Sequence, residues 1–261
     1  MKKILLILAV TFIAMSCIKV KTTTTEVKKV SEERQLKGFK SIAIDGSPDV
    51  HYKQDSVWSV TVFASEEIMP YVRTEVKDGQ LKVFLKRGHP ISKEYTVKIG
   101  DKTIINGSGD VDVMVSSPDL IGITLQGSGN FVAQGKIDTD KLDIRLRGSG
   151  EIKNLDVICD TITTELVGSG DISNMKVDAF SSDVTLIGSG DIKMWQQNVH
   201  NSKILLKGSG DIFIDHNNCG NVFSDLQGSG DIRLTGNVKS LNNKRLGSGD
   251  YELYDLKVLG K

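Results

Sequence analysis

Acidic side chains recur along the chain directly after a Gly-Ser-Gly triplet. The triplets begin at Gly107, Gly127, Gly148, Gly168, Gly188, Gly208, Gly228 and Gly247. Seven of the eight residues that follow them are Asp or Glu, and the exception is Asn130. Carboxylates stacked in a column repel one another unless cations or hydrogen-bond donors neutralise them. The column therefore allows two interpretations, a calcium ladder or a structural corner.

The spacing favours the structural corner. Calcium-binding nonapeptide rolls place a Gly-rich turn every nine residues, whereas these triplets lie 19 to 21 residues apart. Gly adopts the positive φ of a sharp turn without a steric penalty, and the short side chains of Ser and Asp hydrogen-bond to nearby amides. We interpret Gly-Ser-Gly-Asp as a corner, and a calcium-stabilised solenoid remains the alternative.

The residues around each triplet alternate between apolar and polar types, as in half-buried strands. Two residues before the triplets stand Ile105, Leu125, Leu146, Leu166, Leu186, Leu206 and Leu226, with Arg245 in the last copy. An apolar residue also follows each acidic position. Each unit of about 20 residues therefore predicts one coil of an all-β, parallel solenoid with Gly-Ser-Gly-Asp corners.

The segment 39–106 carries weaker signs of the same stack. Gly46-Ser47-Pro48-Asp49 is a degenerate corner that begins 61 residues before Gly107, close to three periods. We therefore expect the solenoid to start near Ser41. Ser65 begins a short predicted helix that Pro70 limits, and Asp78-Gly79 predicts a β-hairpin. We expect this helix and hairpin to cap the first coil.

The N-terminus predicts export. Two lysines precede an apolar run from Ile4 to Met15, which is too short to span a membrane, and Cys17 follows a small residue. This pattern predicts a lipoprotein signal peptide, with Cys17 lipidated and anchoring the protein in the outer membrane, facing the periplasm or the surface. An ordinary signal peptide cut nearby is the alternative.

The predicted organisation is a signal peptide (1–16), a flexible tether (17–37) and a single β-helix domain (38–261). Within the domain we expect decorated N-terminal coils (38–106), eight regular repeats (107–250) and a C-terminal strand or cap (251–261). The net charge is zero, which argues against a nucleic-acid partner. Cys159 and Cys219 occupy the same point of coils three apart, too distant for a disulfide, so we expect two free, buried thiols.

Several observations favour binding over catalysis. The four histidines, His51, His89, His200 and His216, show no metal-ligand spacing. Coils this short leave no room for the long loops that carry active sites in β-helical polysaccharide lyases. We therefore expect a non-catalytic protein without a cofactor, and a carbohydrate-active enzyme is the alternative. A candidate patch for a protein, a glycan or a second copy comprises Val167, Ile187, Trp195, Leu205 and Phe213.

The segments Phe39–Ile42, Gly46–Val50, Val60–Ala64 and Gly79–Leu85, with the serial Gly-Ser-Gly-Asp, resemble a known family. It is the putative auto-transporter adhesin, head GIN domain family, which is common in envelope lipoproteins of Bacteroidetes-type bacteria. The resemblance covers about residues 38 to 256. It implies a right-handed parallel β-helix with an adhesin-like role, and it supplies no catalytic residues.

Overall fold

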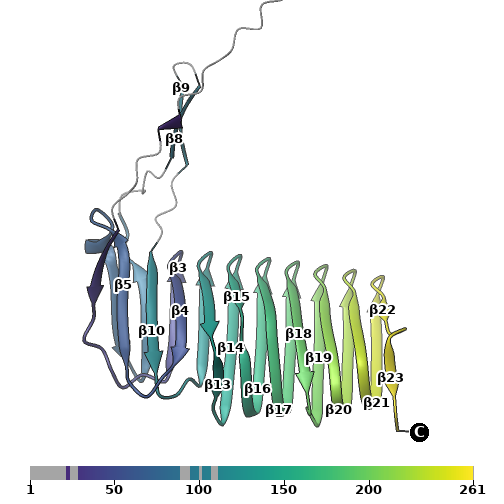
Figure 1. The fold of residues 1–261 in the computed structure, drawn as a ribbon. Helices are drawn as coiled ribbons and strands as arrows, with labels where there is room; N and C mark the ends of the chain where they lie inside the picture. The colour runs from purple at the N-terminus through teal and green to yellow at the C-terminus, as the bar shows by residue number, and fades with distance from the viewer. Residues whose placement is uncertain (1–21, 24–28, 89–94, 100–101, 107–110, 261) are drawn as a thin grey trace, which may run out of the picture.

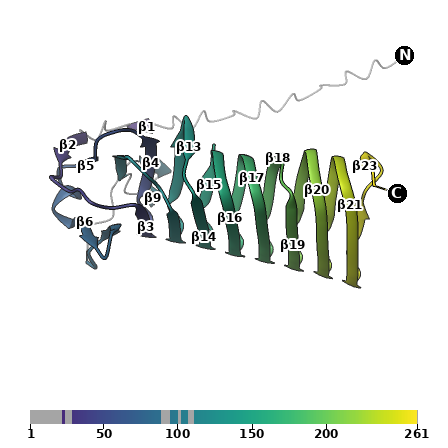
Figure 2. The ribbon, with the colours of Figure 1, turned by 90° about the horizontal axis from the view of Figure 1, so that it is seen from below.

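The computed structural model describes residues 22–23, 29–88, 95–99, 102–106 and 111–260. They form an all-β protein whose main body is a parallel β-solenoid of about seven turns. Its coils stand side by side in a row, which Figure 1 shows from one side and Figure 2 shows after a quarter turn. The predicted all-β parallel solenoid is confirmed.

The regular coils are built from strands that follow one another along the chain. They are β11 (Gly122–Gly127), β12 (Asn130–Gln134), β13 (Lys136–Asp138), β14 (Lys141–Gly148), β15 (Glu151–Lys153), β16 (Asp156–Gly168), β17 (Asp171–Gly188), β18 (Asp191–Gln197), β19 (Asn201–Gly208), β20 (Ile212–Gly228), β21 (Ile232–Gly247), β22 (Tyr251–Glu252) and β23 (Leu256–Val258). Leu146 pairs with Leu166 and Leu166 with Leu186, in parallel register. One sequence period is thus one coil.

The core fills the inside of the coils. The predicted apolar column before the triplets is fully buried at Leu125, Leu146, Leu166, Leu186, Leu206 and Leu226. The column after the acidic positions is equally buried at Phe131, Ile152, Ile172, Ile192, Ile212 and Ile232. Each such side chain contributes about 1.5–3 kcal/mol on burial, so the two columns supply much of the driving force for stacking.

Both glycines of each corner are required by close backbone approach. The carbonyl of Gly168 accepts hydrogen bonds from the N–H groups of Ser189 at 2.9 Å and Gly190 at 3.2 Å in the next coil. A Cβ on Gly188, whose φ is +135°, would lie 2.1 Å from that same carbonyl oxygen. A Cβ on Gly190 would lie 1.8 Å from the carbonyl oxygen of Gly170. The geometry supports the corner interpretation.

A second corner uses asparagine. The residues Asn154, Asn174, Asn198 and Asn218 all adopt left-handed backbone conformations, with φ between +49° and +60°. Asn tolerates this region better than other residues with a Cβ. Their side chains also pair between coils, since Asn218 Nδ2 donates to Asn198 Oδ1 at 2.9 Å. The sequence analysis missed this corner, although the 20-residue interval between Asn198 and Asn218 is visible in the sequence.

The chain enters the stack out of sequence order. β3 (Ser41–Gly46) lies between β7 (Gln80–Leu85) and β11, and β4 (Asp49–Gln54) lies between β10 (Asp112–Ser117) and β12. Gly46 therefore stacks directly on Gly127, and its carbonyl accepts the Ser128 and Gly129 N–H groups. The start near Ser41 and the corner at Gly46 are confirmed. The chain does not pass directly from this coil to the next one, because it builds the end cap before it returns at β10 and β11.

The cap is an antiparallel extension of the first coil. β2 (Lys29–Glu33) pairs with β5 (Ser59–Ser65), β5 pairs with β10, and β6 (Val72–Lys77) pairs with β7. The predicted hairpin at Asp78-Gly79 joins β6 to β7, and both residues have positive φ. The predicted capping helix is wrong. Pro70 lacks the N–H that continues a helix, and only a three-residue 3₁₀ turn, η1 (Met69–Tyr71), forms.

Part of the predicted tether is structured. β2 falls inside the segment 17–37, and Val30 packs against the core. β1 (Thr22–Thr23), β8 (Tyr95–Ile99) and β9 (Lys102–Asn106) form a separate antiparallel sheet. The signal peptide, Cys17 and the triplet at Gly107 lie outside the described residues. Within the described part of the chain, no helix is long and apolar enough to span a membrane.

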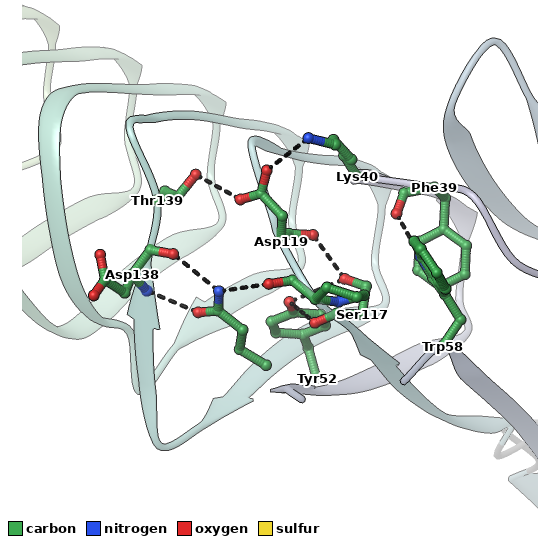
Figure 3. A network of polar contacts seen from close by, with 10 residues as sticks. Phe39, Lys40, Tyr52, Trp58, Ser117, Asp119, Asp138 and Thr139 are labelled. Atoms are coloured by element: carbon green, nitrogen blue, oxygen red, sulfur yellow. Dashed lines mark hydrogen bonds and ion pairs between the residues drawn. The ribbon is translucent and has the colours of Figure 1, made fainter. Parts of the chain in front are cut away.

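A network of polar contacts fastens the cap to the regular coils (Figure 3). The Gln54 amide accepts from the Asp138 N–H at 2.7 Å and donates to the Asp138 carbonyl at 2.9 Å, as a strand residue would. Asp119 accepts from Thr139 Oγ1 at 2.8 Å and from Lys40 Nζ at 3.1 Å. We call Lys40, Gln54, Asp119 and Thr139 the clasp. It joins three segments that are distant in sequence.

The last coil ends the core with polar side chains. Asn243 and Arg245 occupy the columns of Ser224 and Leu226, and both are exposed. Arg245 pairs with Asp250, and the Tyr251 hydroxyl donates to the Lys244 carbonyl at 2.9 Å. A charged side chain on an edge strand, at a position that is buried in the other coils, discourages pairing with the edge of another molecule. The break that Arg245 makes in the leucine column is therefore the C-terminal cap.

Candidate functional site

The acidic corner residues are used by the fold. Asp191 Oδ1 accepts the Asp211 N–H at 3.2 Å, and Asp211 Oδ1 accepts the Asp231 N–H at 2.8 Å. The amide of Asn130 does the same for the Glu151 N–H at 3.1 Å. The described residues contain no group of three or more acidic, His or Cys side chains that would hold a metal ion. The carboxylate column therefore has a structural account as a ladder of hydrogen bonds between coils.

The five residues of the candidate patch do not form one surface. Val167 and Ile187 are neighbours in one column of the strands that lead into the corner, and Leu205 lies in a parallel column beside them. Trp195 and Phe213 lie beyond the corner, on β18 and β20. Ile187 is 39% exposed and Trp195 is 40% exposed. The structure thus separates the three aliphatic residues from two aromatic sites.

Trp195 lies in a groove of about 680 Å³ that crosses successive coils. Two parallel columns of outward side chains line it. The first column is Lys136, Asp156, Lys176, Trp195 and Asp215, and the second is Ile158, Asp178, Gln197 and Asn217, with Asn237 beyond them. We call this surface the Trp195 groove. It is the candidate functional site, because it combines a concave shape with an exposed aromatic ring and converging polar groups.

The polar groups of the Trp195 groove differ in what they already bind. Asp178 Oδ2 accepts from Asn198 Nδ2 at 3.1 Å, and Asp215 Oδ1 accepts from Thr235 Oγ1 at 3.0 Å. The side chains of Gln197 and Asn217 are exposed and make no hydrogen bond within the described part of the chain. The carboxylates are therefore positioned by neighbours, and the two amides have their donors and acceptors available to a ligand.

Phe213 belongs to a separate, smaller site. The Arg233 guanidinium lies over its ring, 5.5 Å from the centroid, and lies at the same distance from the ring of Tyr254. A hollow of about 360 Å³ beside it is lined by Asp191, Lys193, Asp211, Phe213, Asp231, Arg233 and Glu252. Because Arg233 already covers the Phe213 ring, this site offers less free aromatic surface than the Trp195 groove.

The histidines are dispersed and serve different local roles. His51 Nε2 lies 3.1 Å from Asp112 Oδ1, and His200 stacks on Phe180 with ring centroids 4.9 Å apart. His216 is buried and points into the core, and burial lowers its pKa to about 4 despite opposing effects from the Thr235 backbone, Asp215 and the Ile214 backbone. His89 lies outside the described residues.

The two predicted thiols are free and buried, as expected. Burial, with smaller effects from Asp160 and Asp178, raises the pKa of Cys159 to about 11. Burial also raises the pKa of Cys219. Neither thiol is therefore activated as a nucleophile, because the thiolate is the reactive form.

A buried polar layer lies behind the Trp195 groove. Gln196, between Trp195 and Gln197, points inward and donates to Ser182 Oγ at 3.0 Å. In the next coil, His216 pairs in register with Gln196, and Ser202 pairs with Ser182. Both ring nitrogens of His216 and the Ser202 hydroxyl are buried without a hydrogen-bond partner among the described residues. Gln196 Oε1 also lacks a partner there, so the stack changes from a pair joined by one hydrogen bond to a pair joined by none between adjacent coils.

The fold and the groove define a short-coil parallel β-solenoid with a lateral groove. The chain belongs to the putative auto-transporter adhesin, head GIN domain family, whose model matches residues 38–218 and 198–259. Membership of this family indicates a cell-envelope or surface protein. A comparison with curated proteins found no match.

Solved structures from Bacteroides and Parabacteroides species share the fold. A putative adhesin from Bacteroides fragilis is 19% identical with a TM-score of 0.68, and the alignment covers 88% of this chain and 98% of that one. A putative lipid binding protein from Parabacteroides distasonis is 20% identical with a TM-score of 0.64, covering 87% and 97%. A putative adhesin from Parabacteroides merdae is 22% identical with a TM-score of 0.57, covering 87% and 97%. At these identities the likeness shows the fold alone.

Most of the groove was missed in the sequence. Trp195 was recognised only as an aromatic beside an aliphatic patch. The groove residues Lys176, Asp178, Gln197, Asp215 and Asn217 occupy matching positions of consecutive repeats, and that recurrence was the available signal. Their side chains vary from coil to coil, so a search for a repeated residue type does not find them.

Proposed function

We propose that this chain is a non-catalytic, adhesin-like protein of the cell envelope, anchored by a lipid on Cys17, which binds an extended ligand on cell surfaces in the Trp195 groove. The groove itself carries the proposal. It exposes an aromatic ring and two unoccupied amides along a rigid face, and recognition surfaces commonly pair such groups. Membership of an adhesin family supports the same role.

Two features of the groove support binding without catalysis. The strands around it are joined by short turns, such as that between Gln197 and Asn201, so no long described loop folds over the surface to exclude water. The acidic column, which is the most repeated chemical feature of the chain, is engaged in the corners and faces backbone amides. A carbohydrate-active enzyme is the competing function, and it predicts new reducing ends when the protein is incubated with a glycan.

The anchor and the location are tested on cells. We expect the wild-type chain to take up labelled fatty acid and the Cys17→Ser variant to take up none. Digestion of the protein by protease on intact cells would support exposure on the surface. Protection until lysis would overturn the adhesin-like role and indicate a periplasmic scaffold.

The role of the groove is tested by measuring how much of the protein cells retain. Purified full-length protein in detergent is added to cells of the producing strain from which the gene has been deleted, and the bound protein is measured after washing. We expect Trp195→Ala to reduce retention at least tenfold, since aromatic anchors dominate interfaces. Phe223→Ala removes an aromatic that is 48% exposed on another part of the coil, and it should bind like the wild type. Equal retention of the Trp195→Ala variant would refute the role of the groove.

A further inference from the structure

We propose that the ligand of the Trp195 groove is a neutral, linear polysaccharide that lies across the coils. The proposal rests on the proposed function and adds the chemical class of the ligand. Four observations lead to it: the length of the groove, the exposed ring of Trp195, the free amides beside that ring, and the distribution of charge.

The groove has the form of a track for a chain molecule. Its first column runs from Lys136 to Asp215 through five successive coils, about 19 Å at roughly 4.8 Å for each step. The strand β18 in its middle is hydrogen-bonded to a neighbour on both sides. A peptide therefore cannot add to this surface as another strand, because no free strand edge is present there.

Trp195 provides an apolar platform in a polar surrounding. Its side chain is 40% exposed, and its column neighbours are Lys176 and Asp215. A sugar ring combines an apolar face of C–H groups with a polar rim of hydroxyls. The face can pack on the indole while the rim reaches the polar groups around it.

The amides match the hydroxyl rim. Gln197 and Asn217 are in register in adjacent coils, and neither side chain makes a hydrogen bond in the described structure. An amide donates and accepts at the same time, which is what neighbouring hydroxyls also do. Asp178 and Asp215 retain acceptor capacity beyond the single bonds that they form with Asn198 and Thr235.

The charges disfavour other ligands. Lys136 and Lys176 alternate with Asp156 in the first part of the groove, whereas beyond Trp195 the lining contains Asp215 and no cation. A sulfated or uronate polymer would meet uncompensated negative charge there. The exposed apolar side chains in the groove are Ile158 and Trp195, which cannot cover a lipid acyl chain.

Intrinsic fluorescence provides a direct test. The chain has two tryptophans, so Trp58→Phe leaves Trp195 as the sole indole fluorophore. The full-length variant in detergent is titrated with hexasaccharides of β-linked glucose, mannose and xylose. Parallel titrations use glucose and a heparin hexasaccharide in the same detergent, and phosphatidylethanolamine vesicles after the detergent has been removed. The vesicles are included because one structural relative is named as a putative lipid binding protein.

We expect a saturable change in Trp195 emission with at least one neutral hexasaccharide. Its affinity should exceed that for the monosaccharide at least tenfold and should persist in 1 M salt, roughly 3 Å of screening length. The Gln197→Ala, Asn217→Ala double variant should bind at least tenfold more weakly, and Phe223→Ala should bind normally. A response to heparin alone, to vesicles alone, or to none of the probes overturns the proposal.

Failure of this inference is distinguishable from failure of the proposed function. If Trp195→Ala abolishes retention on cells while no neutral hexasaccharide binds, the groove is a binding site and only its ligand class is wrong. If Trp195→Ala leaves retention unchanged, the proposed function itself fails. New reducing ends in the hexasaccharide incubations would instead indicate an enzyme.

Discussion

The regular coils and the first coil with its cap achieve the same stacking by different means. From Gly148 to Gly228 every coil pairs with the coils before and after it in the chain, and the same corner hydrogen bonds repeat. The coil of Ser41–Gln54 instead lies between the cap and the first regular coil, since β3 pairs with β7 on one side and with β11 on the other. The clasp adds side-chain hydrogen bonds between this coil and the regular coils. Stability is therefore distributed evenly in one region and concentrated in a few long-range contacts in the other.

The largest expected effect comes from breaking a regular corner. Gly190→Ala would place a Cβ 1.8 Å from the Gly170 carbonyl oxygen, within a ladder that cannot move without displacing both neighbours. We expect the free energy of unfolding to fall by more than about 3 kcal/mol. Gly135→Ala is the control, since its φ is +79° but no atom lies within 4 Å of the new Cβ, and it should cost about 1–2 kcal/mol. Chemical denaturation measures both.

The clasp should give the next largest effect, confined to the cap. Asp119→Ala removes the acceptor of Thr139 and Lys40, and a loss of about 1–3 kcal/mol is expected. Hydrogen exchange should increase in β3, β4 and β10 and remain unchanged beyond β17. An increase spread over all coils would show that the two regions are not energetically separate.

Acid should weaken the clasp as well. Burial raises the pKa of Asp119, but the hydrogen bonds from Thr139 and Lys40 outweigh it and leave the pKa below the usual 3.8. A lowered carboxyl pKa contributes stability above pH 3.8 that is lost as the pH falls through the folded-state value. Protection from exchange in the cap, relative to the intrinsic rate at each pH, should therefore fall below pH 3.8 in the wild type and less so in Asp119→Ala.

The buried polar layer should make the regular coils sensitive to mild acid. The pKa of His216 is about 4 in the folded state and 6.5 unfolded, so only the unfolded chain gains the proton between these values. The negative charge of Asp215 opposes this shift. Stability should fall by up to about 1.4 kcal/mol per pH unit from pH 6.5 to 4.

A matched variant isolates this effect. His216→Gln would repeat in its coil the pair that Gln196 forms with Ser182, with Ser202 as the partner. Its stability should be nearly constant between pH 6.5 and 4, measured by denaturation at each pH. A slope as steep as that of the wild type would show that His216 is not its source.

The smallest effect should come from the acidic column. Asp211→Asn keeps the oxygen that accepts the Asp231 N–H, as Asn130 does naturally, so stability should change by less than about 0.5 kcal/mol. Addition of calcium or of a chelator should leave the melting temperature of wild type and variant unchanged. A rise of several degrees in the melting temperature with calcium would support the alternative interpretation, a calcium-stabilised solenoid.

The sequence predicted those features that recur in every coil. Leu166 and Leu186 occupy the same position of consecutive repeats, and both are buried. The pattern of one repeat is therefore enough to predict the burial of both. The position of Gly46 on Gly127 was not predictable in this way, because it depends on pairing between strands far apart in the chain. Trp195 was visible, but Gln197 and Asn217 gain their meaning only from being side by side across two coils.

The central claim, that the Trp195 groove is occupied on cells, is tested most directly by oxidative footprinting. Trp58 and Trp195 are each 40% exposed, so Trp58 is an internal reference. The account predicts that the ratio of Trp195 to Trp58 oxidation is lower on intact cells than in the purified protein. An equal ratio in both states would contradict it.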